Sequence, residues 1–197
     1  MQIDAKMVKE LREQTGAGMM DCKKALSEVE GDFEQAVKVL REKGIAKAAK
    51  RSGRSTSEGL IASYIHAGDK LGVMVEVACE TDFVARTDDF KGLARDIAMH
   101  VAAAAPLCVE RDDVDSSLIE KEREIYRQQA LNEGKPEKIV DKIVDGKIEK
   151  YISEIVLMEQ AFVKDNDKTI ADLLKEKVGT LGENIQIKRF SRFRLGE

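Results

Sequence analysis

The sequence changes character within residues 73–86, which read Val73-Met74-Val75-Glu76-Val77-Ala78-Cys79-Glu80-Thr81-Asp82-Phe83-Val84-Ala85-Arg86. The first half is rich in β-branched residues and alternates in polarity, which is typical of a half-buried strand. The second half leads into an amphipathic helix that we expect over residues 88–105. The pattern therefore predicts a strand-to-helix corner at residues 79–86.

A corner of this kind presents side chains outward. A carboxylate at Asp82 beside the large ring of Phe83 would form a rigid probe for a pocket on another molecule. The alternative is that Phe83 and Val84 begin the core contacts of the following helix, and spacing alone favours this alternative.

The residues before the corner predict a hairpin. A β-prone run over 60–66 is followed by a turn at 67–70 and then by the strand 71–79. On that strand Val73, Val75 and Val77 share one face, which is expected of an antiparallel sheet with one buried side. The apolar stripe of the helix after the corner is long enough to cover that side.

Three short helices are expected ahead of the hairpin. Asp4 is a suitable N-cap for a helix over 5–14, the glycines at 16 and 18 separate it from a second helix over 19–30, and Asp32 begins a third. We therefore predict a three-helix module over residues 1–45.

Met19 and Met20 begin the second helix. Two adjacent residues on a helix point about 100° apart, so both cannot lie at the centre of one buried stripe. An exposed methionine there would be an adaptable contact for a partner, whereas two buried ones would fill gaps under the glycine turn. Spacing does not separate these possibilities.

Residues 46–58 are small and basic and predict a linker. Its lysines and arginines could contact nucleic acid, but no aromatic residue is interleaved for base stacking, so a solvated tether is favoured. The net charge of -4 likewise argues against nucleic acid as a direct partner.

Residues 59–197 are predicted to form an α+β core. Beyond the corner helix, apolar spacing predicts helices over 117–134 and 136–159 that pair as an antiparallel hairpin. A short extended piece at 161–164, a helix from Thr169 to Gly179 and a final strand from Ile185 complete the core. The fold class is thus α+β, with a small antiparallel sheet packed by helices.

Familiar catalytic motifs for nucleotides, metals and nucleophiles are missing from the sequence. Cys22, Cys79 and Cys108 are widely spaced and predict neither disulfides nor a zinc site. A nucleophilic site built from Cys79, His66 and Asp82 is disfavoured because the cysteine lies on the face expected to be buried. We expect a cytoplasmic binding or regulatory protein that has no cofactor, no metal and no membrane contact and is not an enzyme.

Two blocks carry a resemblance to a known family. Residues 15–26 (Thr15-Gly16-Ala17-Gly18-Met19-Met20-Asp21-Cys22-Lys23-Lys24-Ala25-Leu26) and residues 80–86 (Glu80-Thr81-Asp82-Phe83-Val84-Ala85-Arg86) resemble the two signature motifs of the bacterial elongation factor Ts family. The motifs are long and specific, and the resemblance covers essentially the whole chain.

The resemblance implies a function. Members of this family are guanine-nucleotide exchange factors that bind elongation factor Tu·GDP and promote GDP release. The N-terminal module would be similar to a ubiquitin-associated fold and would dock on the GTPase domain of elongation factor Tu, and its expected contacts are Leu11, Arg12, Met19 and Met20. In the core, Thr81, Asp82, Phe83 and Val84 would face the nucleotide site, where Phe83 disturbs Mg²⁺ coordination and the phosphate loop.

The resemblance is to the short form of the family, with one core repeat and a plain helical hairpin. Short forms pair to rebuild a two-fold core, so a homodimer is implied. Thr87 stands where many members carry Asn, which is tolerable if the residue serves as a helix cap. The alternative function is a general protein- or RNA-binding module that uses the three-helix unit and the basic linker.

Overall fold

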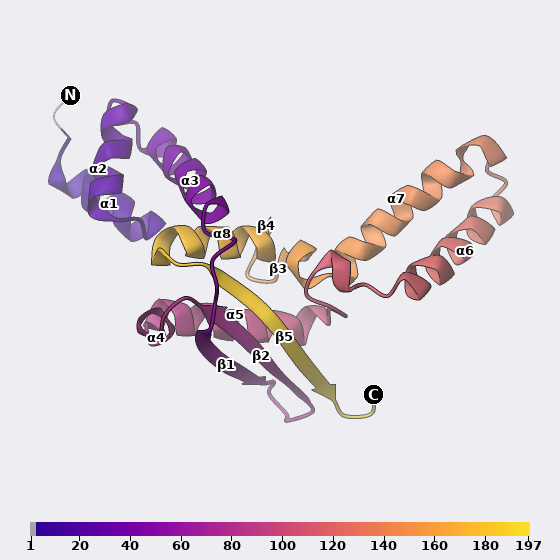
Figure 1. Ribbon diagram of the computed structural model, residues 1–197. Helices are drawn as coiled ribbons and strands as arrows, with labels where there is room; N and C mark the ends of the chain where they lie inside the picture. The colour runs from indigo at the N-terminus through magenta and orange to yellow at the C-terminus, as the bar shows by residue number, and fades with distance from the viewer. Residues whose placement is uncertain (1–2) are drawn as a thin grey trace. The chain divides into compact units, whose positions relative to one another are not determined.

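The computed structural model describes residues 3–197, apart from the side chains of residues 45 and 47 (Figure 1). Three helices come first, namely α1 (Ala5–Thr15), α2 (Met19–Glu28) and α3 (Phe33–Ala49). The side chain of Asp4 caps α1 by accepting from the Lys6 N–H at 3.2 Å, and Asp32 caps α3 by accepting from the Gln35 N–H at 3.0 Å. The predicted helix starts are therefore confirmed.

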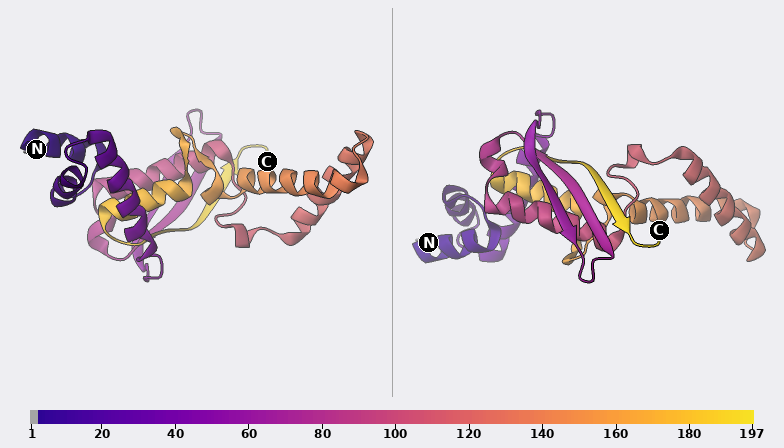
Figure 2. Two further views of the ribbon diagram at one scale, coloured as in Figure 1. Left: turned by 90° about the horizontal axis from the view of Figure 1, so that it is seen from above. Right: turned by 90° about the horizontal axis from the view of Figure 1, so that it is seen from below.

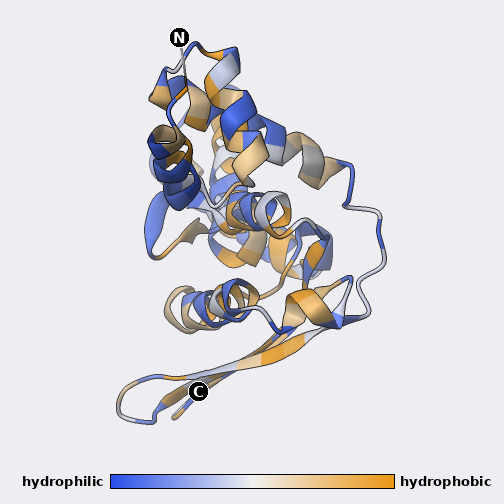
Figure 3. Ribbon diagram, turned by 90° about the vertical axis from the view of Figure 1, so that its left-hand side faces the viewer, coloured by the Kyte–Doolittle hydropathy of each residue, from blue (hydrophilic) through white to orange (hydrophobic). Residues whose placement is uncertain are grey.

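These helices enclose a small apolar core. Its buried members come from all three helices and are Val8, Leu11, Cys22, Ala25, Leu26, Ala36 and Leu40. Polar and apolar residues alternate around the same helices in Figure 3, as amphipathic helices require. Helix α1 ends at Gly16, which has φ +64° and donates its N–H to the Arg12 carbonyl at 2.8 Å. The three-helix prediction is confirmed. Helix α3 continues four residues into the predicted linker, and the domain boundaries themselves stay a prediction.

A three-stranded sheet contains β1 (Glu58–Ile65), β2 (Leu71–Cys79) and β5 (Ile185–Arg194) in the order β1-β2-β5 (Figure 2). Gly68 and Asp69 turn the chain between β1 and β2 with φ of +92° and +56°. Along β2, Val73, Val75 and Val77 are buried while Met74 is exposed, so the predicted alternation is confirmed over residues 73–77, but Ala78 on the opposite face is also buried.

Gly59 marks the closest approach of β1 to β2. Its φ is +144°, and a Cβ at this position would collide with the backbone carbonyl oxygen of Val77. A side chain here would therefore push the end of β2 away from β1, close to the corner that follows β2.

The helices around the sheet are α4 (Asp82–Ala85), α5 (Asp88–Ala104) and α8 (Ile170–Leu181). Helix α8 was expected to end at Gly179, but it runs two residues further. A glycine inside a helix costs about 1 kcal/mol, which the surrounding helix tolerates. The helix ends where Gly182, with φ +81°, donates its N–H to the Val178 carbonyl at 3.0 Å.

Helices α6 (Ser116–Asn132) and α7 (Glu137–Ile155) form the predicted hairpin. Arg123 pairs with Asp145 at 2.6 Å, and Arg127, one turn further on, pairs with Asp141, one turn earlier, at 2.7 Å. Partners that run in opposite directions show that the helices are antiparallel. Their shared core is made mainly of β-branched residues, namely Val140, Val144, Ile148, Ile152, Ile155 and Val156, together with Ala130.

A second, two-stranded sheet was only half predicted. Strand β3 (Ala161–Phe162) matches the expected extended piece, and it pairs antiparallel with β4 (Asp165–Thr169). The sequence of β4 is polar and has no β-prone residues apart from Thr169, so pairing with β3 rather than local preference makes it a strand. Short 3-10 turns occupy Arg111–Asp113 and Leu157–Glu159.

The α+β class is confirmed. By its contacts the chain divides into two compact units, each made of three segments. One unit contains Met1–Leu60, Val77–Ala94 and Asp172–Gln186. The other contains Ile61–Glu76, Arg95–Ala171 and Ile187–Glu197. Across residues 3–197, no helix is long and apolar enough to cross a membrane.

Candidate partner-binding site

The corner after β2 is a single helical turn, α4, that begins directly at the end of the strand. Thr81 is its N-cap, with extended backbone angles (φ -131°, ψ 153°), and its hydroxyl oxygen accepts from the Val84 N–H at 3.4 Å. Thr87 then starts α5, because its hydroxyl accepts from the Phe90 N–H at 3.3 Å and donates to the Val84 carbonyl at 2.7 Å. The predicted capping role of Thr87 is confirmed.

Phe83 projects from this turn into solvent. Its side chain is 77% exposed, whereas its neighbours Val84 and Ala85 are buried at 6% and 8% exposure. The two buried residues anchor the turn to the protein, and the aromatic ring points the other way. An isolated exposed aromatic ring on an anchored turn is a feature of partner-binding surfaces rather than of cores. The interpretation in which Phe83 begins the helix core is wrong.

Asp82 lies beside the ring and forms an ion pair with Arg86 one turn later, with 2.8 Å between Oδ2 and Nη2. Both side chains are more than half exposed, so the pair contributes little to folding. A partner group can therefore replace either member at small cost.

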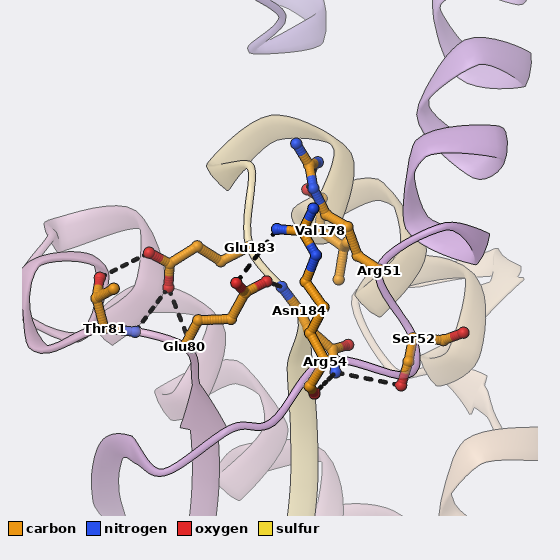
Figure 4. Close-up of polar contacts among 8 residues, drawn as sticks. All are labelled: Arg51, Ser52, Arg54, Glu80, Thr81, Val178, Glu183 and Asn184. Carbon is orange, nitrogen blue, oxygen red and sulfur yellow. Dashed lines mark hydrogen bonds and ion pairs between the residues drawn. The ribbon is translucent and has the colours of Figure 1, made fainter.

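Glu183 holds the residues that precede α4 (Figure 4). One carboxylate oxygen, Oε2, accepts from the backbone N–H groups of Glu80 at 3.1 Å and Thr81 at 3.0 Å. The other oxygen, Oε1, accepts from the Thr81 hydroxyl at 2.6 Å. The cap of α4 is thereby joined to a residue 102 positions later in the chain.

A second carboxylate makes the reverse connection. Glu80 Oε1 accepts from the Asn184 backbone N–H at 2.7 Å, and Oε2 accepts from Arg54 at 3.3 Å. The bond from Asn184 is the main cause that lowers the pKa of the Glu80 carboxyl, and Arg54 adds to it. The buried side-chain amide of Asn184 donates to the carbonyls of Ser52 at 3.3 Å and Arg54 at 2.8 Å. Figure 4 shows the two carboxylates lying side by side in this network.

Cys79 lies under the corner. Its thiol is fully buried and donates to the Thr81 carbonyl at 3.1 Å. Burial raises the pKa of this thiol, which is the opposite of what an activated nucleophile needs. This environment therefore does not support a nucleophilic role for Cys79, which the sequence also disfavours. Over residues 3–197, no group of three His, Cys, Asp or Glu side chains converges as a metal site would.

The residues expected to contact a partner from the three-helix module differ in exposure. Met19 and Met20 are 51% and 63% exposed at the start of α2, and Arg12 is exposed near the end of α1. Leu11 is fully buried in the module core because it lies on the inner face of α1. The two methionines are therefore surface residues, and the side chain of Leu11 is not available for contact.

Sequence reasoning missed Glu183 and Asn184. Nothing in the local pattern marks them, because their role depends on β5 lying next to β2 in the sheet. The one available signal was the Gly-Glu-Asn turn at 182–184, where polar side chains meet a strand start.

The comparisons with known proteins agree over the whole chain. The family model described as "Elongation factor TS" matches residues 2–197. Elongation factor Ts of Desulfosudis oleivorans is 62% identical over 195 residues, which cover 99% of this chain and 98% of that protein. Its counterparts from Carboxydothermus hydrogenoformans and Desulforamulus reducens are 60% and 59% identical, over 99% and 100% of this chain and 90% of each relative.

These matches, together with the α+β fold and the exposed motif at residues 80–86, identify the class of protein as a translation elongation factor. The chain belongs to the elongation factor Ts family. The resemblance carried by residues 15–26 and 80–86 is thereby confirmed.

Proposed function

We propose that this chain acts in the cytoplasm as a guanine-nucleotide exchange factor, which binds elongation factor Tu·GDP and promotes the release of GDP. One observation carries the proposal, namely that Phe83 is 77% exposed on a turn whose neighbouring residues are buried. Family membership supports the same function.

In the proposed complex Phe83 enters the nucleotide-binding domain of the partner and disturbs the Mg²⁺ and phosphate site. Burying a phenylalanine ring contributes about 2–3 kcal/mol, which is enough to favour a conformation of the partner that holds GDP weakly. Thr81 and Asp82 are exposed on the same turn and would line this contact, while buried Val84 would anchor it.

The physical basis is linkage. A protein that binds the nucleotide-free conformation better than the GDP-bound one must weaken GDP binding by the same factor. No covalent bond is made or broken in this activity, so the proposed function is exchange and not enzymatic chemistry.

The three-helix module is proposed to dock on the same GTPase domain through Arg12, Met19 and Met20. Exposed methionines adapt to irregular surfaces, and the arginine adds a charge that can be matched by a partner carboxylate. Buried Leu11 would act only by holding α1 in the module.

We also propose that two copies of the chain form a homodimer through the outer face of the sheet. Ile65 on β1, Met74 on β2 and Phe193 on β5 are 61%, 51% and 70% exposed, and all three line one surface depression. Ile61, on the same face of β1 as Ile65, is 60% exposed. An apolar patch of this kind on a sheet face favours a second apolar face as its cover.

GDP release tests the exchange function. Elongation factor Tu loaded with a fluorescent GDP analogue is mixed with excess GDP and increasing amounts of the chain. We expect the wild type to accelerate release, and Phe83→Ala to lower the maximum rate at least about a hundredfold, because a central aromatic contact carries much of such an interface.

The matched control is Leu107→Ala, which also removes an exposed apolar side chain, 61% exposed, from outside both signature blocks. Its rate should equal that of the wild type. If the wild type leaves GDP release unchanged, the exchange function is wrong. If Phe83→Ala and the wild type accelerate release equally, only the role given to the ring is wrong.

Sedimentation across a range of concentrations tests the dimer. We expect a mass of two chains for the wild type and of one chain for Ile65→Asp, because the new charge would be buried in the proposed interface. Ile139→Asp, at an exposed position of α7, is the matched control and should stay dimeric. A wild-type monomer at micromolar concentration would contradict the proposal.

A further inference from the structure

The turn that carries Phe83 is too short to hold its own shape. Helix α4 has four residues, and an isolated helix of this length is unstable in water. A largely exposed ring on such a turn would turn toward the nearest apolar surface unless the backbone under it were fixed. Buried Val84 and Ala85 fix the inner side of the turn, but they do not hold the residues at its beginning.

Glu183 holds that beginning. Its two oxygens accept all three donors that residues 80 and 81 offer, which are two backbone N–H groups and one hydroxyl. The Thr81 hydroxyl donates to Glu183 and accepts from the Val84 N–H, so one contact sets both the cap and the first turn. Hydrogen bonds to a charged acceptor are about twice as strong as neutral ones.

We propose that Glu183 is a positioning residue for nucleotide exchange, and that it acts through Phe83 by fixing the cap of α4. This inference rests on the proposed exchange function. Glu183 is half-buried, and both of its carboxylate oxygens accept from residues 80 and 81. The carboxylate of Glu183, just before β5, thus controls the direction of the Phe83 ring, just after β2.

The neighbouring contacts explain why Glu183 itself stays in place. The next residue, Asn184, is buried, and it is held from both sides by Glu80 and by the carbonyls of Ser52 and Arg54. Because Asn184 has three partner groups, the backbone beside Glu183 is fixed and the carboxylate cannot simply follow a moving turn. Glu80 contacts Asn184 rather than the cap, so its removal should disturb the ring less than removal of Glu183.

The first experiment measures GDP release from elongation factor Tu with Glu183→Ala and Glu183→Gln, each checked for an unchanged circular dichroism spectrum and for a melting temperature well above that of the assay. We expect Glu183→Ala to lower the maximum rate about tenfold, with the half-saturating concentration changed less than about twofold, because a misdirected group costs rate rather than affinity. Glu183→Gln keeps one oxygen acceptor and should recover about half of the loss on a logarithmic scale.

The matched control is Glu42→Ala, which removes an exposed carboxylate of α3 and the same charge. Its rate should equal that of the wild type. Amide hydrogen exchange in the free protein gives an independent readout, and Glu183→Ala should speed exchange at Glu80, Thr81 and Val84 about tenfold. These amides should be unaffected in Glu42→Ala.

The deciding experiment is the double variant Phe83→Ala/Glu183→Ala. If Glu183 acts through the ring, its removal changes the rate less than about twofold once the ring is gone, because coupled residues are not additive. An equal tenfold loss in both backgrounds would overturn the inference, as would a wild-type rate for Glu183→Ala. If the wild type itself fails to release GDP, the proposed function fails, and the hydrogen-exchange result alone then decides whether Glu183 fixes the cap.

Discussion

The two signature blocks each contain a threonine whose hydroxyl both donates and accepts, and they use it differently. Thr15 donates to the Leu11 carbonyl at 2.6 Å and accepts from the Ala17 N–H at 3.3 Å, so its contacts are local and neutral. Thr81 donates to the carboxylate of Glu183 at 2.6 Å, across 102 residues. The threonine of the first block bonds within four residues of itself, whereas that of the second is held by a distant part of the chain.

The side chains that the two blocks expose differ in the same way. Met19 and Met20 are flexible and follow a glycine turn, while Phe83 is a rigid ring on a held turn. A flexible side chain suits a surface that must adapt, and a rigid one suits a surface that must displace something. The comparison therefore supports the proposal that the module serves binding and the corner serves GDP release.

Exchanging the two kinds of side chain should give the largest effect. Phe83→Met keeps an apolar group but makes it flexible, and we expect the maximum rate of GDP release to fall between about tenfold and a hundredfold. Met20→Leu should change it less than about twofold, since the replacement is close in volume. Stopped-flow fluorescence measures both, and equal losses would remove the distinction between the blocks.

The two threonines provide the next test. Thr81→Val removes a hydrogen bond to a charged group and should lower the free energy of unfolding by about 1 kcal/mol. The same energy lost from the transition state of exchange should lower the maximum rate of GDP release about fivefold. Thr15→Val should lower the free energy of unfolding of the module by about 0.5–1 kcal/mol and leave the maximum rate unchanged. Chemical denaturation and GDP release are measured on both variants. A rate loss in Thr15→Val would show that the module contributes more than binding.

Acid should loosen the corner and leave the module unchanged. The pKa of Glu80 is lowered in the folded protein, chiefly by the Asn184 N–H, so the folded state takes up this proton less readily than the unfolded state. The stabilisation is complete above the ordinary value of 4.5 and is lost as the pH falls through the lower folded pKa. Hydrogen exchange corrected for its intrinsic rate should rise at residues 80–84 as the pH falls from about 4.5 to about 3 and stay constant at residues 15–26. Glu80→Gln should remove the Glu80 part of this pH dependence.

The smallest effect concerns the two buried cysteines. Burial raises the pKa of all three thiols, so exposure should separate them, and the fully buried Cys22 and Cys79 should react with a thiol reagent more slowly than the half-exposed Cys108. Glu183→Ala should speed the reaction of Cys79 a few-fold and leave Cys22 unchanged. The Cys79 thiol donates to the Thr81 carbonyl, which the variant loosens, and the Glu183 charge is, after burial, a cause that raises the pKa of this thiol. Equal acceleration of both thiols would indicate general destabilisation instead of a local opening.

Local signals predicted most of the fold. Caps at Asp4 and Asp32, alternation along Val73–Val77 and the spacing of the α6 and α7 cores all depend on neighbours within a few residues. The continuation of α8 beyond Gly179 and the polar strand β4 were missed, since in both cases surrounding structure outweighs local preference.

The candidate site was predicted in part. Resemblance singled out Thr81, Asp82, Phe83 and Val84, and spacing alone favoured the wrong environment for Phe83. Glu183 lies outside both signature blocks, and only the pairing of β5 with β2 brings it to the corner. Long-range partners of this kind are not encoded in any short window of sequence.

The contact between Thr81 and Glu183 also has a consequence for biosynthesis. Bacterial ribosomes add about 5–20 residues per second, so the motif leaves the exit tunnel several seconds before residue 183 has been made. During that interval Thr81 has no Glu183 carboxylate to bond. A nascent or prematurely terminated chain therefore carries Phe83 on a turn whose cap is not held. On the proposal above, unfinished copies would therefore lack the held corner that nucleotide exchange needs.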